Sequence, residues 1–237
     1  MKTLKTILLI TCAVLISASI MAQNEEPDAR RILSPFSKIK AFGPINVELI
    51  QSGEEKVEIY AEGVNASEVV TELSGSELKV RLKIGIWQHV DVKVKVYYKE
   101  LDELTASAGS SIYSDEMLEM KRLELSANSG SEIKLDVKTT NLKISSGQGS
   151  KITLSGTTDM MDVDINTGGS LKAFDCKATD VYVEINVGGL AEVMAIEKID
   201  AVTNIGGTIK YKGDPKTKSA NTSMGGSIYS VDYTESY

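Results

Sequence analysis

Asn-Ile-Gly-Gly-Thr-Ile at residues 204–209 is one of seven versions of a six-residue phrase that recurs along the C-terminal two-thirds of the chain. Each phrase has glycine at its third position, and successive glycines lie 18 to 21 residues apart. A period of this length is typical of solenoids, in which each repeat forms one coil stacked on the next. The seven anchor glycines are Gly109, Gly130, Gly149, Gly168, Gly188, Gly206 and Gly225.

Two columns of the aligned phrases indicate which side chains face inward and which form the corner. Two residues before the anchor the side chain is small, and four of the seven are asparagines, which suit turns and predict a partial amide ladder: Asn128, Asn166, Asn186 and Asn204. Three residues after the anchor the side chain is almost always aliphatic, which predicts an inward column: Ile112, Ile133, Ile152, Leu171, Ala191, Ile209 and Ile228.

The segments between the phrases alternate apolar and polar residues, as in Leu123-Glu124-Leu125 and Val181-Tyr182-Val183-Glu184-Ile185. Alternation with period two predicts short strands with one buried face. Helix is a poor alternative because glycine returns too often for a helix of useful length. The sequence therefore predicts an all-β fold, a single-stranded β-helix (β-solenoid) with about 19–20 residues per coil.

The N-terminus is typical of an export signal. Lys2 and Lys5 precede an apolar run from residue 7 to residue 20, and Ala22 is a suitable cleavage residue, which predicts a signal peptide over residues 1–22. A lipoprotein signal ending at Cys12 is the alternative. We expect residues 23–35 to form a flexible lead-in, and no later stretch has the roughly 18 apolar residues of a membrane span.

Residues 36–104 alternate like strands but lack the glycine phrase, whereas residues 105–237 hold the seven repeats. Turn signals at 52–53, 62–63 and 74–75 separate these strands. Terminal units of solenoids are atypical because they shield the end of the core. We expect one β-helix domain over 36–237, with 36–104 as a cap or as longer-stranded coils.

Composition and motifs give little support for catalysis. The formal net charge is −7, which disfavours nucleic acid as a partner. His89 is the only histidine, and no base accompanies Cys176. Residues 162–166 imitate the start of an EF-hand loop, but Thr167 stands where glycine is required. No catalytic, cofactor-binding or metal-ligating residue is predicted.

Four segments together resemble a known family: Phe36-Ser37-Lys38-Ile39, Gly43-Pro44-Ile45-Asn46-Val47-Glu48-Leu49, the repeated glycine phrase, and Tyr211-Lys212-Gly213-Asp214-Pro215. The chain is similar, over about residues 36–230, to the auto-transporter adhesins with a head GIN domain, exported proteins common in the Bacteroidota. The resemblance implies a right-handed β-helix and an adhesive role. It carries no catalytic residues over to this sequence.

Three functional hypotheses follow. The first is a non-enzymatic exported module, in the periplasm or on the cell surface, whose flat faces contact a glycan, a host surface or an envelope protein. The second is a carbohydrate-active enzyme of the β-helix type, suggested by fold analogy alone. The third is a periplasmic scaffold that assembles end to end, so that an oligomer is an open expectation.

Overall fold

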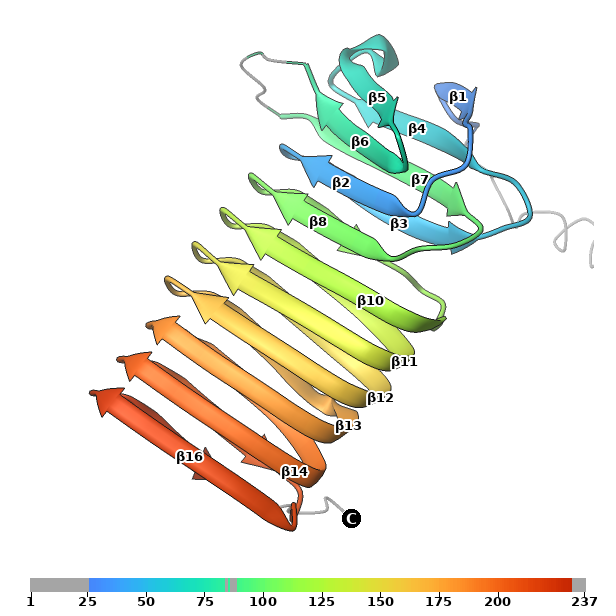
Figure 1. The fold of residues 1–237 in the computed structure, drawn as a ribbon. Helices are drawn as coiled ribbons and strands as arrows, with labels where there is room; N and C mark the ends of the chain where they lie inside the picture. The colour runs from blue at the N-terminus through green and yellow to red at the C-terminus, as the bar shows by residue number, and fades with distance from the viewer. Residues whose placement is uncertain (1–25, 84, 86–88, 232–237) are drawn as a thin grey trace, which may run out of the picture.

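The computed structural model describes residues 26–83, 85 and 89–231, so the expected signal peptide lies outside the described residues. The chain forms a β-solenoid flattened into two sheets (Figure 1). Strands that lead into a glycine corner form the pre-turn sheet, and strands that leave it form the post-turn sheet. The strands are β1 (Ala29–Ile32), β2 (Lys38–Phe42), β3 (Asn46–Gln51), β4 (Lys56–Glu62), β5 (Val69–Ser74), β6 (Glu77–Leu82), β7 (Asp91–Tyr98), β8 (Glu103–Ser107), β9 (Ser111–Tyr113), β10 (Leu118–Asn128), β11 (Glu132–Gly147), β12 (Lys151–Asn166), β13 (Ser170–Val187), β14 (Leu190–Ile205), β15 (Thr208–Lys212), β16 (Thr217–Met224) and β17 (Ser227–Ser230).

The coils stack in register, so equivalent residues of successive repeats lie side by side. In the parallel ladder between β11 and β12, Ile133 pairs with Ile152 and Leu142 with Met161. Each of β11 to β14 runs as one strand through both sheets, and its first half is post-turn while its second half is pre-turn. The all-β solenoid predicted from the period of the glycine phrase is confirmed.

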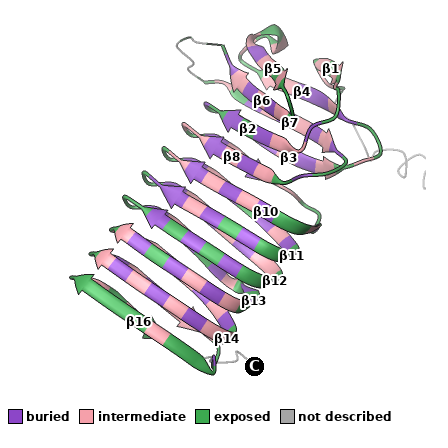
Figure 2. Cartoon of the chain, in the orientation of Figure 1, coloured by how far each residue is buried: buried purple, intermediate pink, exposed green. Residues whose placement is uncertain are grey.

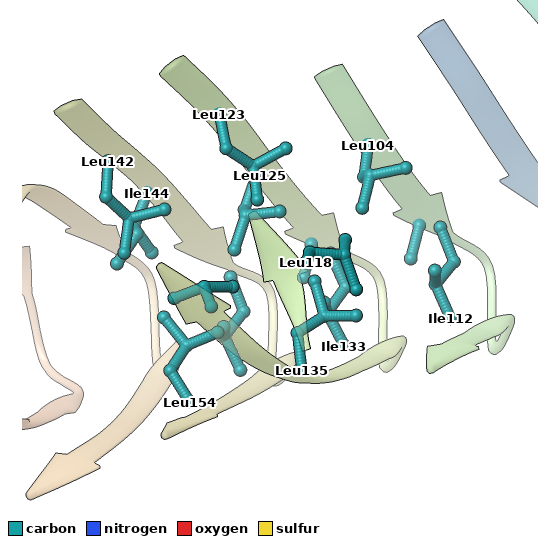
Figure 3. Packing of buried hydrophobic residues seen from close by; sticks show 14 of the residues in the cluster. Leu104, Ile112, Leu118, Leu123, Leu125, Ile133, Leu135, Leu142, Ile144 and Leu154 are labelled. Atoms are coloured by element: carbon teal, nitrogen blue, oxygen red, sulfur yellow. The ribbon is translucent and has the colours of Figure 1, made fainter. Parts of the chain in front are cut away.

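Apolar side chains from both sheets fill the space between them (Figure 3). Burial alternates along β2, β6, β7 and β8, and in β12 to β14 the alternation breaks near the bend between the sheets. Leu104, Ile112, Leu125 and Ile133 are all fully buried. Burying an aliphatic side chain of this size contributes about 1.5–3 kcal/mol. Ions on the outer faces pair between neighbouring coils, as Lys151 does with Glu132 at 2.7 Å, and such exposed pairs add about 0–1 kcal/mol each.

The corners depend on backbone that only glycine adopts without strain. All seven anchor glycines have positive φ, between 56° and 81°. In the first four repeats the preceding residue also has positive φ, from 40° at Thr167 to 55° at Ala108, as in a type I′ turn. In the last three repeats that residue is Val187, Ile205 or Met224 and does not have positive φ. The two groups of repeats therefore turn by different backbone conformations.

A buried serine ties the first three corners to the preceding coil. The hydroxyl of Ser131 accepts a hydrogen bond from the Asn128 amide at 3.0 Å and donates one to the Ala106 carbonyl at 2.8 Å. Ser110 and Ser150 make the same pair of bonds one coil before and one coil after. The serine therefore satisfies backbone groups that the sharp turn leaves without a ladder partner.

From the fourth repeat glycine stands in place of the serine, and a side chain at this position would collide with the preceding coil: a methyl group added at Gly169 would overlap the Ser146 carbonyl. The inward residue three positions before the anchor is Ala, Ala and Ser in the first three repeats, Ile165 and Ile185 in the next two, and Thr in the last two. A methyl group added at Gly207 would lie 2.5 Å from Cγ2 of Ile185. At this corner, therefore, the side chain of Ile185 occupies the space that a side chain at position 207 would need.

The N-terminal third closes that end of the solenoid. β6 and β7 form a coil that stacks in parallel on β2 and β3, which in turn stack on β8 and β9. β5, β4 and β1 then add antiparallel strands outside it. The chain therefore builds its second coil first and its terminal coil later, and residues 36–104 combine coils with a cap.

β1 lies inside the segment expected to be a flexible lead-in, and that expectation is corrected for residues 29–32. Arg31 explains why this polar stretch is ordered. Its guanidinium donates to the Val69 carbonyl at 2.9 Å and to the Thr71 hydroxyl. Because the arginine spans from β1 to β5, its side chain helps to close the cap.

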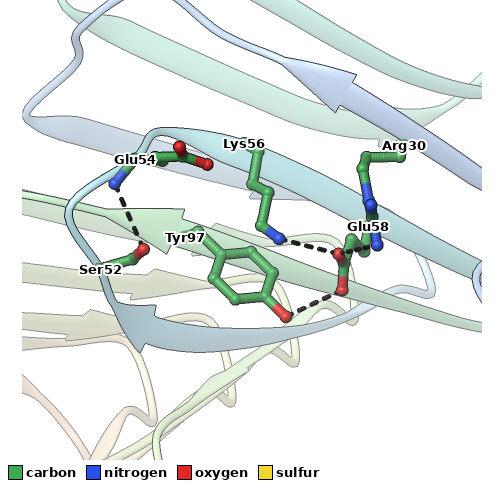
Figure 4. Close-up of polar contacts among 6 residues, drawn as sticks. All are labelled: Arg30, Ser52, Glu54, Lys56, Glu58 and Tyr97. Carbon is green, nitrogen blue, oxygen red and sulfur yellow. Dashed lines mark hydrogen bonds and ion pairs between the residues drawn. The ribbon is translucent and has the colours of Figure 1, made fainter. Parts of the chain in front are cut away.

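A buried carboxylate organises the outer face of the cap (Figure 4). Glu58 on β4 pairs with Arg30 at 2.8 Å and with Lys56 at 3.0 Å, and it accepts a hydrogen bond from the Tyr97 hydroxyl at 2.8 Å. Burial alone would raise the pKa of Glu58, but the hydrogen bonds from Tyr97 and Lys56 outweigh it, so that the pKa lies below its ordinary value. The cap is therefore held together by the ionised form.

The space shared by Gly207 and Ile185 can be tested by a double-mutant cycle. Gly207→Ala should destabilise the protein by about 1–3 kcal/mol through overpacking against Ile185. Ile185→Ala alone should destabilise it by about 2–5 kcal/mol, and the double variant by clearly less than the sum. Urea unfolding measures all three.

Gly53→Ala is the matched control, because an added methyl group there meets no atom within 4 Å and φ is not positive. We expect its unfolding midpoint to match that of the wild type within error. Strict additivity of the two substitutions would show that the corner residues do not share space.

The Glu58 network predicts a dependence of stability on pH. Because the folded pKa is below the unfolded value, the carboxylate contributes stability above about pH 4.5, and that contribution is lost as the pH falls below it. Glu58→Gln should be less stable at pH 7 and should lose less stability on acidification. Thermal unfolding between pH 3 and pH 7 measures both, and parallel pH curves for the two proteins would contradict the assignment.

Candidate functional site

The edge opposite the glycine corners is where the regular coil is interrupted. β11 to β14 cross this edge as continuous strands, whereas residues 114–117 separate β9 from β10 and residues 99–102 separate β7 from β8. Ser114 fixes the first interruption by donating its hydroxyl to the Leu49 carbonyl at 3.2 Å. Leu101 anchors the second because its side chain is buried in the core. Two loops therefore stand beside a continuous sheet.

A groove of about 750 Å³ lies at this junction, and we call it the edge groove. Loop 99–102, β10 and the bend of β11 supply most of its walls, and their side chains are mostly polar. Its lining residues are Gln51, Tyr98, Lys99, Glu100, Leu101, Asp102, Glu119, Met120, Lys121, Arg122, Thr140 and Asn141.

A second hollow of about 370 Å³ continues along the outer surface of the pre-turn sheet. It shares Arg122 and Asn141 with the edge groove and ends at Met160 and Asp162 on β12. Arg122, Asn141 and Met160 occupy one outward column, because Asn141 pairs with both of the others in the ladders. The two hollows therefore offer a track across three coils, about 10 Å long at 4.8 Å per coil.

Charges of both signs line the edge groove. Lys99 is paired with Glu55 at 3.1 Å, and Glu119 with Lys138 at 2.8 Å. Lys121 and Arg122 are exposed and form no ion pair with any described residue. These two cations are therefore available to a ligand without breaking an existing contact.

Tyr98 lies at the floor of the groove and remains neutral. Its side chain is 3% exposed. Burial, with a smaller effect of the Glu116 carboxylate, raises the pKa of Tyr98 to about 12. The ring is thus part of the core and offers no open stacking surface, so the apolar contact available to a ligand is the half-buried Met120.

The residues singled out by the glycine phrase lie at the opposite edge. Arg122 and Asn128 are six residues apart on β10, a distance of about 20 Å along a strand. The apolar column from Ile112 to Ile209 is buried, and Ile228 is partly buried. These residues shape the coil and do not line the edge groove.

Three of the four asparagines form a mixed network with a carboxylate. Asn204 donates to the side-chain carbonyl of Asn186 at 3.0 Å, which is the one direct amide pair among them. Asn166 and Asn186 both donate to Asp164. Asn128 donates to a serine of its own strand and is separated from Asn166 by Gly147. The amide ladder predicted from the sequence is therefore short, and carboxylates complete it.

The residues that the sequence analysis weighed as catalytic or metal-binding candidates lie apart from one another. His89 is exposed, and Trp87 beside it lies outside the described residues. Cys176 is fully buried, and burial, with a smaller effect of Asp136, raises the pKa of its thiol to about 12. The EF-hand-like run 162–166 lies on a straight strand, and the described residues contain no group of three metal-ligating side chains. Sequence reasoning missed the edge groove, whose residues follow no motif.

Among the described residues there is no helix with the length and apolarity to cross a bilayer. Comparison with curated proteins gave no match. Among solved structures, the fold is similar to a putative adhesin from Bacteroides fragilis, with 20% identity, a TM-score of 0.79, and coverage of 86% of this chain and 95% of that one.

Two further structures from Parabacteroides are similar, each with a TM-score of 0.66 and coverage of 88% of this chain and 98% of the other. One is a putative lipid binding protein from Parabacteroides distasonis, 25% identical, and the other a putative adhesin from Parabacteroides merdae, 21% identical. The family model described as "Putative auto-transporter adhesin, head GIN domain" matches residues 35–215. The chain therefore belongs to the auto-transporter adhesin, head GIN domain family.

Proposed function

We propose that this protein is a non-enzymatic, exported binding module that holds a glycan in the edge groove. The observation that carries the proposal is a polar groove of about 750 Å³ at the place where loops interrupt an otherwise regular solenoid. Loops positioned by a rigid scaffold are common sites of binding. The adhesin family and the solved adhesins of the same fold support a binding role.

The chemistry of the groove suits a sugar chain. Hydroxyl groups both donate and accept hydrogen bonds, and the groove offers donors from Lys121 and Arg122, acceptors from Glu100 and Asp102, and an amide at Asn141. The continuing hollow toward Met160 gives room for more than one sugar unit. An extended ligand would thus lie across neighbouring coils.

The proposal is binding without bond cleavage, and it is supported by the adhesin description of the family and of a solved structure with this fold. Cleavage of a glycan would use a pair of carboxylic acids, and Glu100, Asp102 and Glu119 of the groove carry carboxyl groups. Turnover of a bound polysaccharide would instead favour the carbohydrate-active enzyme.

The compartment is part of the proposal. The N-terminal pattern of Lys2, Lys5 and an apolar run supports export. Protease shaving of intact cells carrying a tagged copy distinguishes the surface from the periplasm. Loss of the tag from intact cells would indicate the surface, and protection until the outer membrane is opened would indicate the periplasm.

Glycan-array binding by the purified protein tests the proposed ligand class. We expect a defined set of glycans to bind, and the double substitution Lys121→Ala with Arg122→Ala to weaken binding at least tenfold. Both side chains are exposed, so the double variant should unfold at the same temperature as the wild type.

Lys134→Ala provides the matched control, because Lys134 is an exposed lysine on the outer face of the post-turn sheet. Its binding should equal that of the wild type. Glycan binding that is unchanged in the double variant would place the site elsewhere, and an array without any bound glycan would contradict the ligand class.

A further inference from the structure

The two ends of the solenoid are built differently. At the N-terminal end, antiparallel strands cover the coil formed by β6 and β7, and Val80, Val94 and Val96 are fully buried. At the C-terminal end, β16 pairs with β14, and β17 with β15, and no described strand pairs with the outer edge of either. Figure 2 shows β16 almost entirely exposed, in contrast to the alternating strands before it.

An uncovered edge of this kind is a template for another chain. Its unpaired amides and carbonyls can accept a further strand, and parallel coils of the same protein have the matching spacing. Natural proteins protect such edges with charges that point inward. The inward residues of β16 therefore determine whether another strand can pair with this edge.

One inward column changes from apolar to charged side chains at this end. Along the pre-turn sheet the column is apolar in five successive coils and then ends in a lysine. In order, its members are Leu123, Leu142, Met161, Val181, Ile199 and Lys218.

The charged ammonium of Lys218 lies at the C-terminal end of the described solenoid, where it pairs with Asp214. Its ammonium lies 2.9 Å from Oδ1 of Asp214, whose side chain is 97% exposed, and the lysine side chain itself is 46% exposed. The aliphatic stem can cover Ile199 while the ammonium remains in water. A strand added to β16 would enclose that ammonium between two cores.

Other inward positions of the last coil follow the same trend. Ala220 stacks on Ala201, Thr222 on Thr203, and Ser230 on Tyr211. Ile228 is partly buried against the core, and Met224 at the end of β16 is an exposed apolar side chain. Between Lys218 and Met224 the inward positions of β16 therefore hold only small side chains, Ala220 and Thr222.

We propose that Lys218 prevents a second copy of this chain from pairing with the open edge of β16, so that the solenoid ends as a monomer. The contact that it blocks is antiparallel pairing of β16 with β16 of the second copy. Such pairing would bring two ammonium groups into one merged core. Each ammonium would then either lose Asp214 or take that exposed carboxylate out of water, and both results are unfavourable. This inference opposes the end-to-end scaffold and is independent of glycan binding.

The test compares the association of wild type, Lys218→Ile and Lys218→Met by sedimentation velocity over a range of concentrations. We expect the wild type to stay monomeric and both variants to form dimers at concentrations at least tenfold lower than any at which the wild type does. Lys218→Met keeps the length of the stem, so it remains informative if the branched isoleucine disturbs folding. Circular dichroism and thermal unfolding verify the fold of each variant.

Lys216→Met is the matched control, because Lys216 pairs with Glu197 on the surface with its side chain 78% exposed. It should remain monomeric. A wild type that assembles, or folded Lys218 variants that stay as monomeric as the wild type, would overturn the proposal.

A disulfide locates the contact. Asn221→Cys puts a thiol on the exposed middle of β16, and the native Cys176 is buried and does not interfere. In the Lys218→Met background, mild oxidation should link two copies through residue 221, whereas in the wild-type background it should not. Dimers that form without this link would place the contact elsewhere and contradict the role of Lys218.

Discussion

The hydrogen bonds that join one glycine corner to the next are the interactions on which the rest of the structure depends. The amide of Gly130 donates to the Gln148 carbonyl at 3.1 Å, that of Gly188 to the Ile205 carbonyl at 2.7 Å, and that of Gly206 to the Met224 carbonyl at 3.0 Å. The ladder therefore continues through the turn and fixes the register of the strands on both sides. A slip of one residue would move each inward column to the outer face.

The same constraint determines where a binding site can form. Regular coils present flat, ion-paired faces, and their interior is filled by columns such as Ile133 to Leu171. Room for a ligand arises where the coil departs from its repeat. In this chain that place is the edge opposite the corners, where loop 99–102 and residues 114–117 interrupt the strands. The rigid coils on either side hold these loops in position.

The sequence predicts the coil well because its signals are local. Glycine at a fixed period, alternation between corners and the aliphatic column from Ile112 to Ile209 all follow from residues close to one another. The change from Ser131 and Ser150 to Gly169 and Gly207 is also visible, but explaining it requires the register, because the atoms that a side chain would meet there, the Ser146 carbonyl and the Ile185 side chain, belong to the neighbouring coil. Lys218 could have been found by extending the aligned columns.

Features that depend on distant parts of the chain could not be predicted. The coil of β6 and β7 lies outside the coil of β2 and β3 because antiparallel β4 and β5 intervene, and no local pattern encodes that order. Arg31 orders a polar segment through partners about 40 residues away. The edge groove combines residues 98–102, 119–122 and 140–141 without any shared motif.

Native-state hydrogen exchange of the corner amides, followed by NMR, tests the central claim most directly. The amides of Gly130, Gly168 and Gly188 should exchange as slowly as those of the buried strands, because they are bonded between coils. The amide of Gly225, in the last described coil, should exchange much faster. Fast exchange at the three inner glycines, like that of open turns, would contradict the account.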